Sequence, residues 1–270
     1  MKLYLGLALL GTIAAAALAA PWLGSHDPFL PDLFNRYAPP SAEHLLGTDD
    51  LGRDVALRLL HGARVSLAVG LGAAVLAMLL GTTAGLLAAW RGGLTDALIM
   101  RLADALLALP ALPLLVVLSA IDPAVIGLPR GAAGADMLRI ATILAAFGWV
   151  GVARLVRASA LSVLAMDFCR AARALGVTET RLLWRHVLPQ LAGPVSVATA
   201  LAVAGAILAE SALSFLGLGI APPAASWGNM LANAQEAVFQ APLVALWPGL
   251  AILLAVLGCS LVADGMRNSP

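Results

Sequence analysis

The stretch VSLAVGLGAAVLAMLLGTTAGLLAAW, residues 65–90, contains no charged residue and decides the fold class of this chain. A helix that crosses a hydrocarbon core of roughly 30 Å needs about 20 mostly apolar residues, and this run is longer than that. Of all residues, 61% are hydrophobic and 11% are charged, whereas a soluble domain carries about 25% charged residues. The surplus of apolar side chains needs a bilayer as its solvent, so the sequence predicts an all-α membrane protein.

Five further runs have the length and composition of membrane spans. The six predicted spans are residues 3–20, 65–90, 98–121, 138–157, 187–209 and 237–263. A seventh charge-free run, residues 211–235, is broken by glycine and proline residues, among them Gly217, Pro223 and Gly228. Irregular backbone exposed to lipid leaves polar groups unsatisfied. We therefore expect this run to form a structured loop or re-entrant segment at the surface.

Lysine and arginine residues indicate how the spans are oriented. With the N-terminus in the cytoplasm, ten of the sixteen lie on the inner side, and the densest cluster adjoins two spans. Both termini are then cytoplasmic. The chain divides into a first transmembrane helix (1–22), an extracytoplasmic segment (23–64) and a five-helix domain (65–270) with an inner loop at 158–189.

The first run also has the features of a secretory signal peptide. Because further spans follow it, we expect it to remain as an anchor, and whether it is processed stays open.

Several classes of function lack the residues that they need. Lys2 is the only lysine in the chain, and a P-loop ATPase uses a lysine within a glycine-rich loop. Any ATP hydrolysis must therefore belong to a partner. Cys169 and Cys259 are far apart, and the four histidines show no metal-ligand spacing. The net charge of +1 gives no basic patch for nucleic acid. We expect no catalytic residue, no metal site and no cofactor in this chain.

Ionisable residues within spans are costly and are usually paired or functional. Asp104 follows Arg101 by three residues, so a local ion pair on one helical face is expected. Arg154 and Arg157 are expected to extend toward the cytoplasmic headgroups. Glu210 lies at the outer end of the fifth span, where water is expected to reach it. This pattern argues against a proton-coupled carrier, which needs a carboxylate deeper in the bundle.

Small residues and prolines within the spans predict features of helix packing. Gly81 and Gly85 form a GxxxG pattern that allows two helices to approach closely. Pro110 and Pro113 in the third span, and Pro248 in the sixth, are expected to bend their helices.

The most informative inner segment is DFCRAARALGVTETRLLWRHVLP, residues 167–189. Asp167 is placed to cap a short helix, Gly176 is placed to end it, and Thr178 is placed to cap a second one. Pro189 disfavours helix at Leu188. The sequence thus predicts a helix–glycine–helix elbow, with a small alanine face for another protein and with solvated arginines. An interfacial amphipathic helix whose arginines touch lipid phosphates fits the same residues equally well.

Four motifs, in this order along the chain, carry a resemblance to a known family. The run RAARALG (170–176), followed by Leu188-Pro189, resembles the EAA loop of ABC importer permeases. GTDDLGRD (47–54), continuing to GARVSL (62–67), and ESALSFLGLG (210–219), with Pro222-Pro223 and SWGN (226–229), are similar to segments of the C-type permease of dipeptide, oligopeptide and nickel importers. Asp96, Met100, Arg101 and Asp104 resemble that family's third span. The resemblance runs from about residue 45 to the C-terminus.

The resemblance implies a type I ABC importer permease fold in the bacterial cytoplasmic membrane. It implies four kinds of partner besides lipid: a homologous B-type permease subunit, two ABC ATPase subunits that bind ATP and Mg, and an extracytoplasmic solute-binding protein. The ATPase-coupling residues carried over from the family are Arg170, Ala171, Ala172, Arg173, Leu175, Gly176, Arg181, His186 and Pro189. The extracytoplasmic motif residues carried over are Gly47, Thr48, Asp49, Gly52, Arg53, Asp54, Glu210, Phe215, Gly217, Gly219, Pro223, Trp227 and Gly228.

One position departs from the family pattern. Arg170 stands where the family usually has the glutamate of EAA, so the charge at the presumed ATPase contact is reversed. We expect that contact to depend more on Ala171, Ala172 and Gly176. The resemblance favours peptides as the substrate class, with nickel or a metal chelate next. The residues themselves leave two rivals open, namely an ion-coupled secondary carrier and a membrane scaffold without transport activity.

Overall fold

The computed structural model describes residues 1–23, 27–121, 125, 133–237 and 239–267. The expected extracytoplasmic segment therefore includes three residues, 24–26, that lie outside the described part, and residue 238 of the expected sixth span does as well. The described residues form helices and short turns, with no named strand among them. This agrees with the expected all-α class.

Among the described residues, five helices are long and apolar enough to cross a membrane. They are α1 (Lys2–Leu23), α2 (Val55–Arg91), α5 (Ala133–Leu164), α9 (Ala192–Phe215) and α11 (Pro242–Arg267). The third expected span is two helices, α3 (Gly93–Ala108) and α4 (Ala111–Ser119), which meet at a bend of 88°. Six spans are therefore counted only if this bent pair is one span.

The bend between α3 and α4 lies at Pro110, the N-cap residue of α4. Proline lacks the N–H that would continue the ladder of α3, so the expected bend at this position is confirmed. Pro113 lies in the first turns of α4, where an N–H has no partner within the helix. Pro248 lies inside α11, whose helix is continuous through it.

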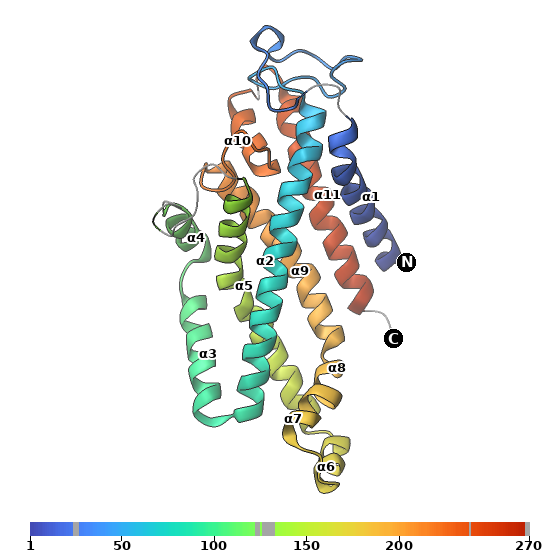
Figure 1. Cartoon of the computed structure of the whole chain (residues 1–270), viewed down its shortest axis with the longest axis vertical. Coiled ribbons are helices and arrows are strands. Elements are labelled where there is room, and N and C mark those ends of the chain that lie inside the picture. Colours follow the sequence, from blue (N-terminus) through green and yellow to red (C-terminus); the bar gives the residue numbers. More distant parts are fainter. Residues whose placement is uncertain (24–26, 122–124, 126–132, 238, 268–270) are drawn as a thin grey trace.

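Helix α2 is the central element, and Figure 1 shows it running the length of the bundle between α5 and α9. It begins at Val55, ten residues before the expected span, because Asp54 accepts a hydrogen bond from the Leu57 N–H at 2.8 Å and so caps the helix. A Cβ on Gly81 would lie 2.6 Å from the Trp149 oxygen, and one on Gly85 would lie 2.5 Å from the Ala153 oxygen. The expected GxxxG packing is therefore the contact between α2 and α5.

Helices α1 and α11 pair along the other side of the bundle (Figure 1). A Cβ on Gly6 would lie 2.8 Å from the Gly258 oxygen, so their backbones are close. Lys2 Nζ lies 2.9 Å from an Asp264 carboxylate oxygen. The start of α1 and the end of α11 thus lie side by side.

The remaining helices are short. The inner loop contains α6 (Asp167–Ala174), α7 (Glu179–Leu182), a π-helical turn (Leu183–Val187) and α8 (Leu188–Gln190). A 3₁₀ turn spans Leu33–Asn35, and α10 spans Trp227–Ala237. The run 211–235 is not a span, as expected, and residues 221–223 within it are exposed, but the run does not lie wholly at the surface. The Trp227 side chain is 1% exposed and packs in the core against α2, α9 and α11.

Candidate functional site: an inner elbow and an outer cap

The inner loop has the expected helix–glycine–helix shape. Gly176 follows α6 with φ of +81°, a left-handed conformation that glycine adopts without a Cβ clash. Its N–H donates to the Arg173 oxygen at 2.9 Å, and the Val177 N–H donates to the Ala172 oxygen at 3.1 Å, which closes the helix end. We call residues 167–189 the elbow.

One of the two expected cap residues of the elbow helices differs from the observed one. Met166 is the N-cap residue of α6. Asp167 occupies the first turn, where its negative charge stabilises the helix through the helix dipole. Thr178 is the N-cap of α7, but its side chain makes no capping hydrogen bond. The sequence position of a possible cap does not show which residue leaves helical geometry, and here the chain enters α6 one residue earlier.

The expected break at Pro189 is also wrong. Leu188 has helical dihedral angles, and its N–H reaches back five residues to the Leu183 oxygen. This π-helical turn widens the helix, so that a proline without an N–H is accommodated without ending it. The elbow therefore continues through α8 toward α9.

The elbow is attached to α5 through a buried apolar cluster. Cys169, Leu182 and Val187 are fully buried against Val156 and other residues of α5. Within the elbow, Arg173 Nε lies 2.7 Å from a Glu179 carboxylate oxygen, which joins α6 to α7 and raises the pKa of Arg173. Burial raises the pKa of the Cys169 thiol. The two short helices are therefore one compact unit.

The outer face of the elbow is exposed and mixed in character. Leu175 is 84% exposed and Trp184 is 68% exposed. The alanine Ala171 is exposed, whereas Ala172 and His186 are partly buried. Arg170, Arg181, Gly176 and Pro189 are also exposed, and Arg170 lies 3.4 Å from Asp167. Exposed apolar side chains with exposed guanidinium groups around them, two of which pair with acids of the elbow, are typical of a protein-binding surface.

At the opposite end of the molecule, the GTDDLGRD motif folds into a tight loop before α2 (Figure 1). Arg53 Nε lies 2.8 Å from an Asp49 carboxylate oxygen, and Arg58 Nε lies 3.3 Å from the same carboxylate. Gly47 and Gly52 have φ of +78° and +74°, and a Cβ on Gly52 would lie 1.7 Å from the Asp32 oxygen. Only glycine fits at residue 52.

Other polar residues of this loop are held by hydrogen bonds. Thr48 is fully buried, and its hydroxyl accepts the Ala38 N–H at 2.8 Å. Asp54 caps α2 and also lies 2.9 Å from His44 Nδ1. The motif is therefore a folded structural unit, with its charges paired.

The second outer motif surrounds a buried acid. The Glu210 side chain has no exposed surface, so the expectation that water reaches it is wrong. Residues 216–229, which we call the outer cap, fold back over it between α9 and α10. Within this region Gly217 turns the chain with φ of +75°, and Gly228 packs against Ser211. Phe215, the last residue of α9, is 40% exposed. The position of Glu210 near a helix end did not reveal that the cap covers it.

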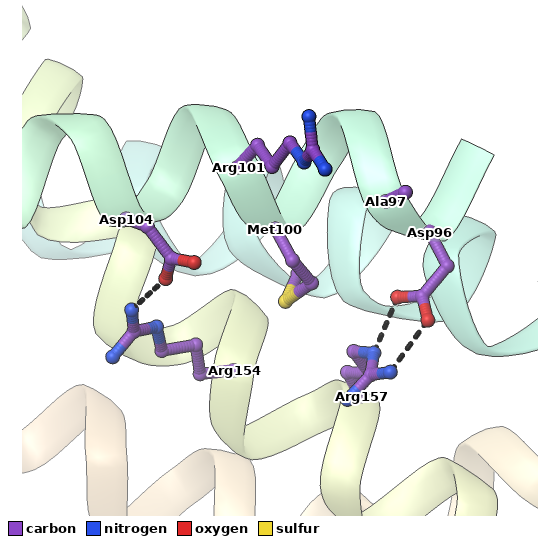
Figure 2. Close-up of a pocket in the computed structure, with 7 residues that line it drawn as sticks. All are labelled: Asp96, Ala97, Met100, Arg101, Asp104, Arg154 and Arg157. Carbon is purple, nitrogen blue, oxygen red and sulfur yellow. Dashed lines mark hydrogen bonds and ion pairs between the residues drawn. The ribbon is translucent and has the colours of Figure 1, made fainter. Parts of the chain in front are cut away.

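Between α3 and α5 lies a polar pocket of about 450 Å³, shown in Figure 2. Arg157 donates two hydrogen bonds to the Asp96 carboxylate, and Arg154 donates one to Asp104. The expected Asp104–Arg101 pair is wrong, because α5 supplies the partner of Asp104, and Figure 2 shows Arg101 on the other side of α3. Arg154 and Arg157, which were expected to extend toward headgroups, are the partners of Asp104 and Asp96. Two ion pairs thus hold α3 to α5.

Comparison with known proteins decides the family. Residues 81–268 match the model of the binding-protein-dependent transport system inner membrane component.

The chain belongs to this family.

Relatives match nearly the whole permease. A protein of Brucella suis biovar 1 (strain 1330) is 40% identical over 98% of this chain and 85% of its own length. The di/tripeptide transport system permease protein DppC of Pseudomonas aeruginosa (strain UCBPP-PA14) is 39% identical over 98% of this chain and 86% of its own length. The oligopeptide transport system permease protein OppC of Bacillus subtilis (strain 168) is 36% identical over 98% of this chain and 83% of its own length.

A solved structure supports the same fold. A chain of the MetNI methionine ABC transporter, in an inward-facing form, matches with a TM-score of 0.59, covering 77% of the permease and 94% of that chain. The two sequences are 18% identical. The permease therefore has the type I ABC importer fold. Its family model and its relatives show that it is a transmembrane permease subunit of a binding-protein-dependent transport system.

The structure gathers the motif residues of the permease at two ends rather than one site. The elbow residues lie together at one end of the bundle, and the GTDDLGRD and ESALSFLGLG motifs lie near the opposite end (Figure 1). Ser66 and Arg157 were missed as partners of motif residues. A signal for Ser66 was present, since it is one of three hydroxyl side chains within the charge-free run 65–90.

Proposed function

We propose that this permease forms one half of the membrane pore of an importer that moves peptides into the cytoplasm. Relatives over nearly the whole chain are named for oligopeptides and for di- and tripeptides, and a glutathione transport permease of Pectobacterium atrosepticum is 38% identical over 85% of the chain. Glutathione is itself a small peptide. These names support peptides over nickel or a metal chelate.

The partners follow from what the permease lacks. With Lys2 as its only lysine, the chain has no P-loop. ATP and Mg therefore bind to two separate ATPase subunits, and a homologous permease supplies the other half of the pore. The pairing of Lys2 with Asp264 supports two termini on one side of the bacterial inner membrane, which we place in the cytoplasm.

The elbow carries the proposal. It is an exposed unit of two short helices, tied rigidly to α5 by the cluster around Cys169 and followed directly by α9. A push on its outer face from an ATPase subunit would therefore move α5 and α9 together. That motion would tilt the bundle and switch the cavity from inward-facing to outward-facing. Solute would arrive from a binding protein at the outer segments 22–64 and 211–236.

The test is a Gly176→Pro variant in the complete complex, co-purified and reconstituted in vesicles. Proline cannot adopt the positive φ of residue 176, so the elbow is distorted. We expect ATP hydrolysis to continue while uptake of alanyl-alanine is lost. Gly193→Ala, at a glycine with open space around it, serves as the control. Normal uptake with the proline variant would refute the coupling role.

The role of the outer segment has its own test. Deletion of residues 29–45 should abolish stimulation of ATP hydrolysis by a peptide-loaded binding protein. Stimulation that persists after the deletion would contradict this assignment. Identification of the proteins that co-purify with the tagged permease tests the partner set directly.

A further inference from the structure

A fully buried carboxylate organises the outer end of the permease. Glu210 lies in α9 with no exposed surface, and no ion pair joins it to a described residue. One of its oxygens accepts the Ser66 hydroxyl of α2 at 2.9 Å, and the other accepts the Ser214 hydroxyl of α9 at 2.7 Å. A buried acid is costly unless its oxygens are satisfied, so these two serines matter to it.

Each serine also holds the outer cap. The Ser66 oxygen accepts the backbone N–H of Trp227 at 3.2 Å, and the Ser214 oxygen accepts the backbone N–H of Ile220 at 3.1 Å. Two positions of the cap, Ile220 and Trp227, are therefore each connected to Glu210 through one serine hydroxyl. Linked hydrogen bonds of this kind polarise one another and fix a unique arrangement.

The fit of the cap around these serines is tight. A Cβ on Gly219 would lie 2.1 Å from the Ser214 hydroxyl, and a Cβ on Gly228 would lie 2.4 Å from the Ser211 oxygen. The Asn229 amide closes the cap on itself, since it accepts the Ser226 N–H at 3.0 Å and donates to the Ala224 oxygen at 2.8 Å. The cap can shift only if hydrogen bonds to the buried acid break.

The Trp227 indole adds a further tie to α2. Its Nε1 donates to the Leu59 oxygen at 3.1 Å. The cap is thus fastened to α2 by the indole and by Ser66, and to α9 by Ser214. Helix α9 in turn follows the elbow at its inner end.

We propose that Glu210 is a positioning residue that fixes the outer cap to α2 and α9 through Ser66 and Ser214. Through these bonds, docking of a loaded binding protein on the cap is transmitted to the two helices that run toward the elbow. Two acceptor oxygens are needed because two hydroxyls must be held at once. This inference rests on the proposed importer function.

The test uses single serine variants, because they remove one arm and leave the acid in place. In the complete complex in vesicles, we measure ATP hydrolysis without and with binding protein loaded with alanyl-alanine. For Ser66→Ala and Ser214→Ala we expect ATP hydrolysis without binding protein to be unchanged. We expect the concentration of binding protein that gives half-maximal stimulation to rise about fivefold or more, which is the size of effect that follows when coupling between two sites is lost. Ser196→Ala is the control, since this exposed hydroxyl of α9 donates only to the Gly193 oxygen.

Glu210→Gln provides a second kind of variant, because an amide keeps one acceptor oxygen and should weaken stimulation about as much as the loss of one serine. If the serine variants reached half-maximal stimulation at the same binding-protein concentration as the Ser196→Ala control, the inference would be overturned. The importer function would then remain intact. A lack of any stimulation in the unaltered complex would instead refute the importer function, and the inference with it.

Discussion

Arg157 of α5 binds both oxygens of Asp96 of α3, across sixty-one residues of sequence. Helix α3 has only one buried residue, Ala103, so it packs weakly by apolar contact. The Gly92–Gly93 turn, with positive φ at both residues, joins α3 to α2, and Pro110 marks its other end. Charge pairs therefore contribute much of what holds this helix to the bundle.

The first prediction concerns this pair. Arg157→Asp places two carboxylates together and should lower the stability of the permease in detergent by about 1–3 kcal/mol. The combined change Asp96→Arg with Arg157→Asp restores opposite charges and should recover most of the loss. The measurement is the midpoint of thermal unfolding followed by tryptophan fluorescence.

Arg101→Asp is the control for charge alone, since Arg101 lines the same pocket but forms no ion pair with a described residue. If the double variant were no more stable than Arg157→Asp, the pair would have no stabilising role.

The second prediction separates two glycines of α2. A Cβ at Gly85 would lie 2.5 Å from the Ala153 oxygen, whereas one at Gly72 would lie 3.8 Å from the Ala141 Cβ. Alanine normally stabilises a helix interior by roughly 0.5–1 kcal/mol relative to glycine. Gly72→Ala should therefore raise the unfolding midpoint slightly, and Gly85→Ala should lower it because α5 must move away. Equal effects of the two variants would show that the α2–α5 contact is not close at Gly85.

Much of this packing was accessible from sequence. The charge-free runs predicted the long helices, because a segment that crosses a bilayer must satisfy its backbone hydrogen bonds internally, as a helix does. Gly176 and the Gly81–Gly85 pattern were also predictable, since glycine is favoured at a positive φ and where a neighbouring helix leaves no space for a Cβ. These features depend on local rules that act within a few residues.

The errors share a different cause. The partner of Asp104 is brought by α5, fifty residues away, and a sequence shows only the nearer Arg101. Glu210 is covered by a cap whose fold depends on Ser66, 144 residues distant. Pro189 was expected to end a helix, but a π-helical turn accommodates it. Tertiary contacts, which local patterns do not specify, decide each of these cases.

The third prediction concerns the chemistry of Cys169. This thiol is fully buried, and burial raises its pKa. The thiolate is the reactive form, so a raised pKa leaves less of it at neutral pH. Maleimide should label Cys169 about tenfold or more slowly than a Thr180→Cys variant on the exposed surface of α7. Equal rates in the folded permease would mean that the elbow is not packed against α5.

The final prediction tests what the exposed face of the elbow contacts. Leu175 is 84% exposed, and burying a leucine in an interface is worth about 1.5–3 kcal/mol. Leu175→Asp should therefore weaken association with the ATPase subunits by roughly 10- to 100-fold, measured as the ATPase retained on a tagged permease during washing. Leu45→Asp is the matched control, because Leu45 is 70% exposed in the outer segment at the opposite end of the bundle. An elbow that binds lipid phosphates would retain the ATPase subunits equally well in both variants, which would contradict docking at this face.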